Sequence, residues 1–537
     1  MNTRKFFQFI RSNIEEFNNW KSYRYEYNYA SYLFKSLKRE DLKNKIIVFN
    51  SVRSLKNILD RDFYFAKLLA LYGLQVIVIL DDGILKHWDT LQVDNIKDLK
   101  DIKNIHFNLY PNYKIISKNF FKIILKKNII HKSLKSFKDK NLQIRYYSQI
   151  IRDVNYKDWS KLRKYAVSST VRFFKNSELD YNDKYVKYYY NLSIMNALLS
   201  RNVGEYILKK IKPDFFITSH GIYSTWGPAF DYLKDNGIKS YVYASKHSHS
   251  TDYHDIYFID TKVQTLSRSN FWQKFKKKTL SKEMENDVKQ LFKLRLQHST
   301  KDTEIYYNET SQFKVNKNDG YKYHIAIFPN LIWDGNIEDR HGAFRGILDW
   351  LIETIKYFQN KDDVKFFIKF HPAEVTMFKN STSIQYLLEK KIDLRNIKNL
   401  ELISTEDNID SYEFIKSGID LGIVYDGILA LEIPLLKIPV LLGGVGGRFS
   451  VEHGNFTIKS KKDYFNYLDN IGKIIEDFKI NYDNYYRNIV KYAFWYLFEI
   501  VFKLPILSNK EKYATDLLQL RSSELMLDEK FLKILDI

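Results

Sequence analysis

Short apolar runs alternate with longer segments of helical periodicity through the first half of the chain. Residues 54–74 lie between two runs of strand length and place apolar side chains at helical spacing, which predicts a helix closed by Gly73. Strands separated by helix-length segments are typical of βαβ units and predict a mostly parallel sheet. The runs that predict buried strands are 45–51, 75–80, 214–219 and 240–245.

The same alternation restarts in the second half. Residues 296–322 are polar and lack clear periodicity, so they predict a connection between two domains. Beyond them, residues 344–358 carry apolar side chains at i, i+3 and i+4 spacing, which predicts an amphipathic helix. Further strands are expected at 323–328, 364–370, 419–424 and 439–444.

The chain has 537 residues, more than one hydrophobic core usually supports. We therefore expect an α/β protein with two βαβ domains facing a cleft, helical insertions and a C-terminal helical tail. The expected parts are a first domain at 1–300 with a basic helical insertion at about 113–210, a linker at 301–322, a second domain at 323–480, and the tail at 481–537.

Composition narrows the class of partner. The formal net charge is +21 and cysteine is absent, which excludes disulfides, thiolate metal sites and a cysteine nucleophile and fits a reducing compartment. The lysines are dispersed, and no helix-turn-helix, zinc-finger or RNP-like pattern is present. We therefore expect an anionic membrane surface or an anionic substrate rather than nucleic acid as the partner.

Two apolar stretches bear on localisation. Residues 1–17 lack a sustained apolar core, so we expect no signal peptide. Residues 492–502 are strongly apolar but contain Glu499 and are too short to span a bilayer, so they predict a buried helix. These features predict a cytoplasmic protein on the inner face of the cell membrane, held peripherally.

The stretch VKFFIKFHPAE at 364–374 ends a predicted strand in a histidine followed by proline. In open α/β sheets, ligands bind at the carboxyl ends of the strands. His371 and Pro372 are therefore candidate ligand contacts, with Lys369 and Glu374 on either side. The alternative is that His371 is only a turn residue.

A second strand end carries Tyr425, Asp426 and Gly427 in a strand-to-helix turn. Asp426 fits the N-cap of the following helix, whose free amides could hold a phosphate. Glu432 lies farther along that helix, where its carboxylate could accept ribose hydroxyls. The alternative for Glu432 is an exposed helix residue. Pro434 inside the helix predicts a bent or short helix.

The order of these motifs resembles the capsule and surface-polysaccharide biosynthesis glycosyltransferases of the GT-B fold. WDG follows a strand, and then come KFHPAE, YDGILALE, PVLLGG, GRF and HGNF; the resemblance covers 323–470 and extends to 220–243. It implies two Rossmann-like domains, a nucleotide-sugar donor on the second, a glycan or lipid-linked glycan acceptor on the first, and no metal or cofactor. The donor-site residues that it implies are His371, Pro372, Tyr425, Asp426, Gly427 and Glu432.

Transfer to an acceptor hydroxyl needs a general base. Asp81-Asp82-Gly83 closes a strand of the first domain, and an acidic-acidic-Gly motif paired with a His-Pro motif resembles bacterial sialyltransferases of the GT-B type. We favour Asp82 as the base and expect Asp81 to bind the turn amides. The alternative is a simple Asp-Gly turn. His220 also closes a strand and is the second candidate, unless it is a turn histidine.

Several further polar residues lie at the same predicted edges. Asp334 and Arg345 follow the first strand of the second domain, where Arg345 could pair with phosphate or remain a solvated surface residue. Lys246 and His247 begin a histidine-rich stretch that we interpret as a loop lining the cleft rather than a metal site. Arg448 follows a glycine-rich loop and is expected near phosphate.

Together these features predict a metal-independent glycosyltransferase that extends a capsule or lipopolysaccharide glycan from a nucleotide-activated sugar, with a CMP-linked sugar as one candidate donor. Two alternatives remain open. One is a polyol-phosphate transferase that uses a CDP-activated donor, and the other is a non-catalytic scaffold or polysaccharide-binding protein at the membrane surface. The sugar, the linkage and the oligomeric state do not follow from the sequence.

Overall fold

The computed structural model describes most of both predicted domains. The described residues are 40–52, 62–86, 141–151, 159–246, 255–335, 341–376, 382–503 and 531–532, with gaps inside these ranges at 63–64, 67–68, 71, 82, 301–302, 304–310 and 312.

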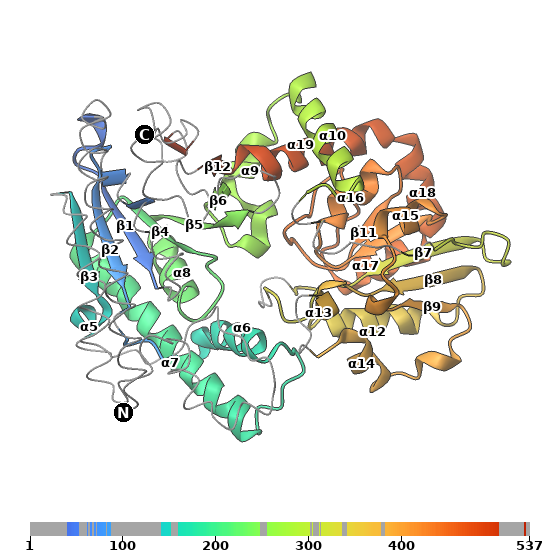
Figure 1. The fold of residues 1–537 in the computed structure, drawn as a ribbon, viewed down its shortest axis with the longest axis horizontal. Coiled ribbons are helices and arrows are strands. Elements are labelled where there is room, and N and C mark those ends of the chain that lie inside the picture. Colours follow the sequence, from blue (N-terminus) through green and yellow to red (C-terminus); the bar gives the residue numbers. More distant parts are fainter. Residues whose placement is uncertain are drawn as a thin grey trace, which may run out of the picture.

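The first domain is built on a seven-stranded sheet of order β12-β6-β5-β4-β1-β2-β3 (Figure 1). The strands from β3 to β5 are parallel, whereas β6 and β12 are antiparallel to their neighbours. The strands are β1 (Ile46–Ser51), β2 (Gln75–Leu80), β3 (Leu142–Tyr146), β4 (Phe215–Ser219), β5 (Lys239–Lys246), β6 (Asp255–Ile259) and β12 (Val501–Lys503).

The helices of this domain pack beside the sheet. The long helix α7 contacts α6 on one side and α8 on the other, and α8 contacts β4 and β5 (Figure 1). Their bounds, with those of the smaller helices, are α5 (Tyr147–Ile150), α6 (Arg163–Phe174), α7 (Lys184–Tyr206), α8 (Gly227–Asp235), α9 (Asn270–Phe275) and α10 (Lys282–Leu296).

The second domain has a five-stranded, all-parallel sheet of order β11-β10-β7-β8-β9. Counted from β1 and β7, both domains share the order 3-2-1-4-5 over their parallel strands, which is the doubly wound Rossmann-like arrangement. The expectation of two Rossmann-like domains is therefore confirmed. The strands are β7 (Tyr323–Phe328), β8 (Val364–Lys369), β9 (Leu400–Ile403), β10 (Leu421–Val424) and β11 (Val440–Leu442).

Helix α12 buries most of the apolar stripe that the sequence predicts, including Leu348, Leu351 and Phe358, against this sheet, whereas Phe344 is buried ahead of the helix, which begins at Ile347. The helices of the domain are α12 (Ile347–Phe358), α13 (Ala373–Thr376), α14 (Ile384–Glu389), α15 (Ser411–Lys416), α16 (Leu429–Leu435), α17 (Lys461–Asp469), α18 (Ile471–Ile480) and α19 (Tyr482–Phe494). Among the described residues, no helix is long and apolar enough to cross a membrane.

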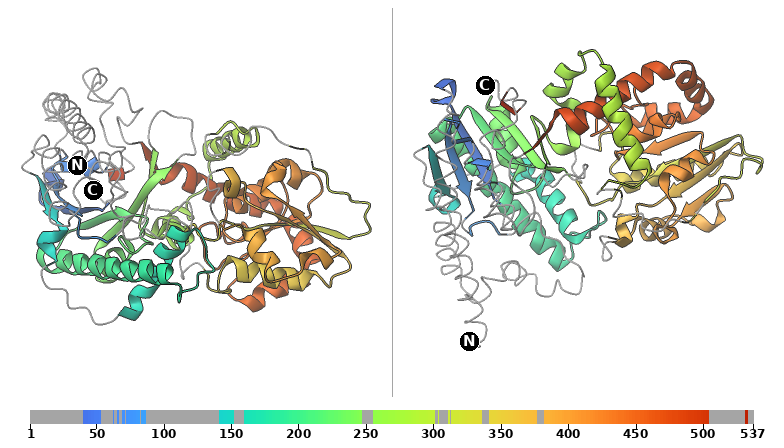
Figure 2. Two further views of the ribbon diagram at one scale, coloured as in Figure 1. Left: turned by 60° about the horizontal axis from the view of Figure 1, so that its bottom comes forward. Right: turned by 45° about the horizontal axis from the view of Figure 1, so that its top comes forward.

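The chain crosses between the domains more than once. Helix α10 leaves the first domain and packs on α19 of the second. After α19, a π-helix (Trp495–Glu499) leads into β12, which pairs with β6 of the first sheet, and Figure 2 shows this return. The expectation of one helix over 492–502 is therefore wrong at its end, because Val501 and Phe502 join a strand.

Helix α6 also ties the domains together. Val171 is buried in the core of the second domain. The carbonyl of Lys175 accepts a hydrogen bond from the Thr382 amide at 3.3 Å, and Lys391 pairs with Glu178, just beyond α6, at 2.6 Å. The two domains therefore share apolar, backbone and ionic contacts along this helix.

Candidate functional site

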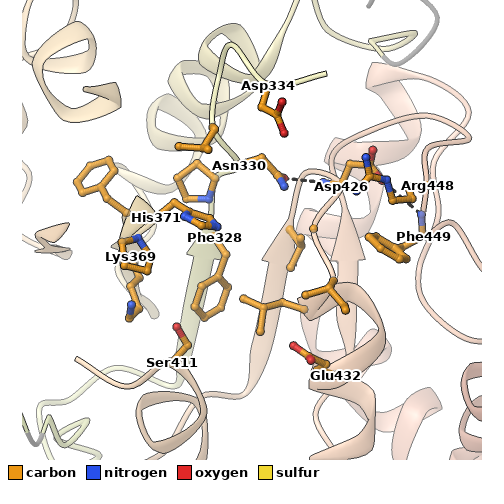
Figure 3. A pocket seen from close by; sticks show the side chains of 18 of the residues that line it. Phe328, Asn330, Asp334, Lys369, His371, Ser411, Asp426, Glu432, Arg448 and Phe449 are labelled. Atoms are coloured by element: carbon orange, nitrogen blue, oxygen red, sulfur yellow. Dashed lines mark hydrogen bonds between the residues drawn. The ribbon is translucent and has the colours of Figure 1, made fainter. Parts of the chain in front are cut away.

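A cavity of about 380 Å³ lies at the carboxyl ends of β7, β8 and β10 (Figure 3). This volume falls within the range of about 300–1,000 Å³ typical of small-molecule sites. The residues that line the cavity include Asn330, Asp334, Lys369, His371, Pro372, Ser411, Asp426, Gly427, Glu432 and Arg448. The cavity thus collects eight residues that the sequence proposes: Asp334, Lys369, His371, Pro372, Asp426, Gly427, Glu432 and Arg448.

His371 stands just beyond β8 with a fixed tautomer. Its Nδ1 accepts a hydrogen bond from the Ala373 amide at 3.1 Å, so the proton of the neutral ring is on Nε2. Burial, helped by the charge of Lys369, lowers the pKa of His371 to about 4, although Asp334 opposes this shift. At neutral pH the ring is therefore uncharged and can donate a hydrogen bond from Nε2.

Lys369 is the last residue of β8 and is only 5% exposed. Burial lowers the pKa of its ammonium to about 8, and the charges of Asp410 and Asp407 offset only part of that effect. A cation that has already lost most of its water binds an anion with little further desolvation. Lys369 is therefore the clearest anion-binding group in the cavity.

The turn after β10 is stabilised by the neighbouring loops. The Asp426 amide donates to Asn330 Oδ1 at 3.0 Å, and Asp426 Oδ1 accepts from the Phe449 amide at 3.3 Å. Gly447 passes so close that a Cβ there would lie 2.7 Å from the Asp426 carboxylate.

Two predictions concern the helix that follows this turn. The prediction that Asp426 is the N-cap is wrong, because the N-cap of α16 is Ile428. The prediction that Pro434 gives a short helix is confirmed, since α16 has 7 residues.

Glu432 is buried rather than exposed, which removes the surface alternative for this residue. Arg295 from α10 is buried beside it and donates its Nε–H to Glu432 Oε1. Both residues line the cavity, and their pairing leaves neither side chain as an uncompensated buried charge. One oxygen of Glu432 is therefore already engaged.

Three residues that the sequence proposes for the nucleotide-sugar donor site do not line the cavity. Tyr425 is fully buried behind it, with its hydroxyl bonded to His341 Nδ1 at 2.7 Å. The Arg345 side chain is 91% exposed and pairs with Asp349 at 2.7 Å, as expected for a surface arginine. Glu374 is buried, and its Oε1 accepts from the Ile384 amide at 3.3 Å.

The loop 443–449 docks on the first domain. Arg448 donates its Nε–H to the carbonyl of Val263 at 3.2 Å, and Ser267 Oγ donates to the carbonyl of Gly447 at 2.8 Å. Gly335, with a φ of 57°, lies where a Cβ would be 2.2 Å from the Gln264 side chain. The 3₁₀ helix Val263–Arg268 is therefore held by two segments of the second domain.

Asp81 and His220, the base candidates that the structure describes, lie in the first domain and do not line the cavity. Asp81 is buried, and its Oδ1 accepts from the amides of Gly83, Ile84 and Leu85 at 2.8–3.1 Å, so it organises the turn. Asp82 lies outside the described residues, as do His247 and the side chain of Lys246.

His220 follows β4 in a left-handed conformation with a φ of 47°. Ser219 Oγ lies within hydrogen-bond distance of its Nδ1, and its ring stacks on Trp226 with centroids 5.3 Å apart. A histidine in this strained region at a strand end is often functional, because other contacts must maintain the conformation. The conformation of His220 is therefore maintained by its contacts with Ser219 and Trp226.

The sequence reasoning missed Asn330, Ser411 and Arg295. Asn330 follows β7, and the strand-end rule that singled out His371 could have found it. Ser411 starts α15 and Arg295 lies near the end of α10, and neither has a local signal of a site. Among the described residues, no group of three or more His, Cys, Asp or Glu could hold a metal ion.

No protein-family model and no curated protein matches this chain. Among solved structures, the KpsC beta Kdo 2,4 transferase of Thermosulfurimonas dismutans is 11% identical with a TM-score of 0.32, over 47% of this chain and 75% of that chain. The wall teichoic acid polymerase TagF is 11% identical with a TM-score of 0.22, over 92% of this chain and 96% of that chain.

UDP-GlcNAc 2-epimerase from Neisseria meningitidis, bound to UDP-GlcNAc, is 12% identical with a TM-score of 0.20, over 84% of this chain and 98% of that chain. At these identities and TM-scores, the likenesses carry no argument about function. The assignment of the fold rests on the strand order of the two sheets.

Glu374→Gln should stabilise the protein increasingly as pH rises. Burial raises the pKa of Glu374 from 4.5 to about 7, so the folded state binds this proton more tightly than the unfolded state. Stability from this group is full below about pH 4.5 and is lost as pH rises to about 7. The shift corresponds to roughly 3 kcal/mol of folding free energy that the wild type loses over this pH range. A glutamine at position 374 is neutral at every pH and does not show this loss.

Thermal unfolding of both proteins between pH 5 and pH 8 measures this effect. The melting temperature of Glu374→Gln relative to wild type should rise with pH, whereas the exposed control Glu476→Gln should show a flat difference. A pH-independent difference for Glu374→Gln would contradict a raised pKa at this position.

Proposed function

We propose that this protein is a GT-B glycosyltransferase that transfers a sugar from a nucleotide-activated donor to a surface polysaccharide. The observation that carries the proposal is the cavity at the carboxyl edge of the second sheet. There a buried lysine and a neutral histidine face an arginine across the cavity, at the topological position where Rossmann-like domains bind nucleotides. The ordered motifs of the sequence support the same function.

The residues of the cavity suit a leaving nucleotide. In the reaction, an acceptor oxygen forms a bond to the anomeric carbon while the bond from that carbon to the donor phosphate breaks. Lys369, Arg448 and the Nε2–H of His371 would meet the charge that develops on the phosphate. These groups are held in place before the reaction, because His371 is oriented by Ala373 and Arg448 by Val263.

The acceptor hydroxyl must lose its proton to a base from the first domain. Asp82 remains the first candidate, and the engagement of Asp81 with the turn amides supports the division of roles between the two carboxylates. His220 remains the second. It is linked to the second domain through packed groups, since Trp226 contacts Tyr223 and Tyr223 contacts Arg172.

The wild-type protein should be stabilised by at least one of CMP, CDP, UDP and GDP in a thermal-shift screen. His371→Ala should weaken that nucleotide about 10–100-fold, because a hydrogen bond to a charged group contributes about 1.5–3 kcal/mol. The unliganded melting temperature serves as the control for folding. Unchanged nucleotide affinity in a folded His371→Ala variant would remove His371 from the donor site.

Nucleotide affinity should also fall as pH rises through about 8. The pKa of Lys369 is lowered to about 8, so its ammonium loses the proton and its attraction for phosphate in this range. The pKa of His371 is about 4, so His371 should add no pH dependence between pH 6 and pH 9. Titration calorimetry across that range measures both effects. Lys369→Arg should flatten the profile, and a wild-type profile flat to pH 9 would exclude Lys369 as the anion contact.

Asp82→Asn should lower turnover about 10²–10⁴-fold with little change in nucleotide affinity, as expected for loss of general-base assistance. The measurement is release of nucleotide from the donor in the presence of an acceptor glycan. If Asp82→Asn keeps wild-type turnover and His220→Asn loses it, His220 is the base. Analysis of the product distinguishes transfer of a sugar from transfer of a polyol phosphate. A protein that does not turn over any donor would instead support the scaffold alternative.

We further propose that the protein binds the inner face of the membrane peripherally. Lys276, Lys277 and Lys278 are exposed directly after α9, and the whole chain carries +21. Anionic vesicles should therefore co-sediment the protein at low salt and release it at high salt, since such attraction is screened. Replacing the three lysines by Gln should weaken co-sedimentation, and binding equal on neutral and anionic vesicles would contradict an electrostatic origin.

A further inference from the structure

Arg172 belongs to the first domain but reaches a residue of the donor cavity in the second. Its Nη1 donates to Asp334 Oδ1 at 2.6 Å, and its guanidinium carbon lies 5.3 Å from the centroid of the Tyr223 ring. The side chain is 23% exposed, against 55% for Asp334. Arg172 is thus held between an aromatic face and a carboxylate that is partly open to solvent.

Asp334 is an unfavourable neighbour for a phosphate. It lines the cavity with His371 and Arg448, and its charge acts on both. It opposes the lowering of the pKa of His371 and contributes to the raised pKa of Arg448. A carboxylate that interacts with both groups repels an anion that binds between them unless another cation compensates its charge.

We propose that Arg172 is a positioning residue that neutralises Asp334 and thereby makes the donor cavity competent for a nucleotide phosphate only when α6 is docked on the second domain. The inference rests on the proposed function and extends it, because it couples donor binding to the contact between the domains. Loss of that contact would separate Arg172 from Asp334, which lines the cavity.

The same interface offers a matched control. Lys391 and Glu178 form an ion pair at 2.6 Å between the same two domains, but neither residue lines the cavity. Their side chains are 44% and 38% exposed, so the pair contributes little to stability by itself. Lys391→Gln therefore removes a charge from the contact between the domains and leaves the charge of the cavity unchanged.

The test is titration calorimetry with CMP, CDP, UDP and GDP on the full-length protein. Arg172→Gln should raise the dissociation constant of the binding nucleotide about tenfold, which corresponds to about 1.4 kcal/mol. Lys391→Gln should leave it unchanged. The double variant Arg172→Gln/Asp334→Asn should bind like Asp334→Asn alone, because without the carboxylate there is nothing left to neutralise. The effect of Arg172→Gln should shrink at high salt.

Two results would overturn the inference while the proposed function stands. One is a wild-type affinity in folded Arg172→Gln. The other is an equal loss when Arg172→Gln is made in the Asp334→Asn background, which would indicate a structural role independent of the carboxylate. If none of the four nucleotides binds the wild-type protein, the proposed function fails and this inference fails with it.

Discussion

Parallel pairing of β7 with β8 and with β10 is the constraint on which the site depends. Ile327 pairs with Ile368, and Phe328 pairs with Val424, so the three strands end at one edge. Because all three run in the same direction, the residues that follow them lie close together although they are up to about a hundred positions apart in sequence. Asn330, His371 and Asp426 reach the same cavity for this reason.

Charge in this cavity is balanced pair by pair. Arg295 compensates Glu432, and Arg172 compensates Asp334. Burial lowers the pKa of Lys369, and among the described residues the charges of Asp410 and Asp407 offset part of that effect. This buried cation therefore lies at the strand end where the topology favours a ligand, and a bound anion would favour its charged form.

The sequence predicts the strand ends well because an apolar run that stops abruptly marks both the strand and its edge. His371, Pro372 and Asp426 were found in this way. It does not reveal which way a side chain turns after the strand ends: Tyr425 and Glu374 turn into the protein behind the cavity, and Arg345 turns to solvent. Arg295 and Arg172 could not be found at all, because their partners lie 137 and 162 positions away and no local pattern records such contacts.

The return of residues 495–503 to the first domain has a consequence for biosynthesis. Tyr496 lines the cavity of the second domain, and β12 covers the edge of β6 in the first sheet. Both segments leave the ribosome after all of the strands that they complete. During translation β12 is therefore not available to pair with β6 while the second domain is being made, and an open strand edge can pair with other chains. Until residues 501–503 are made, the first sheet lacks the strand that covers this edge in the finished fold.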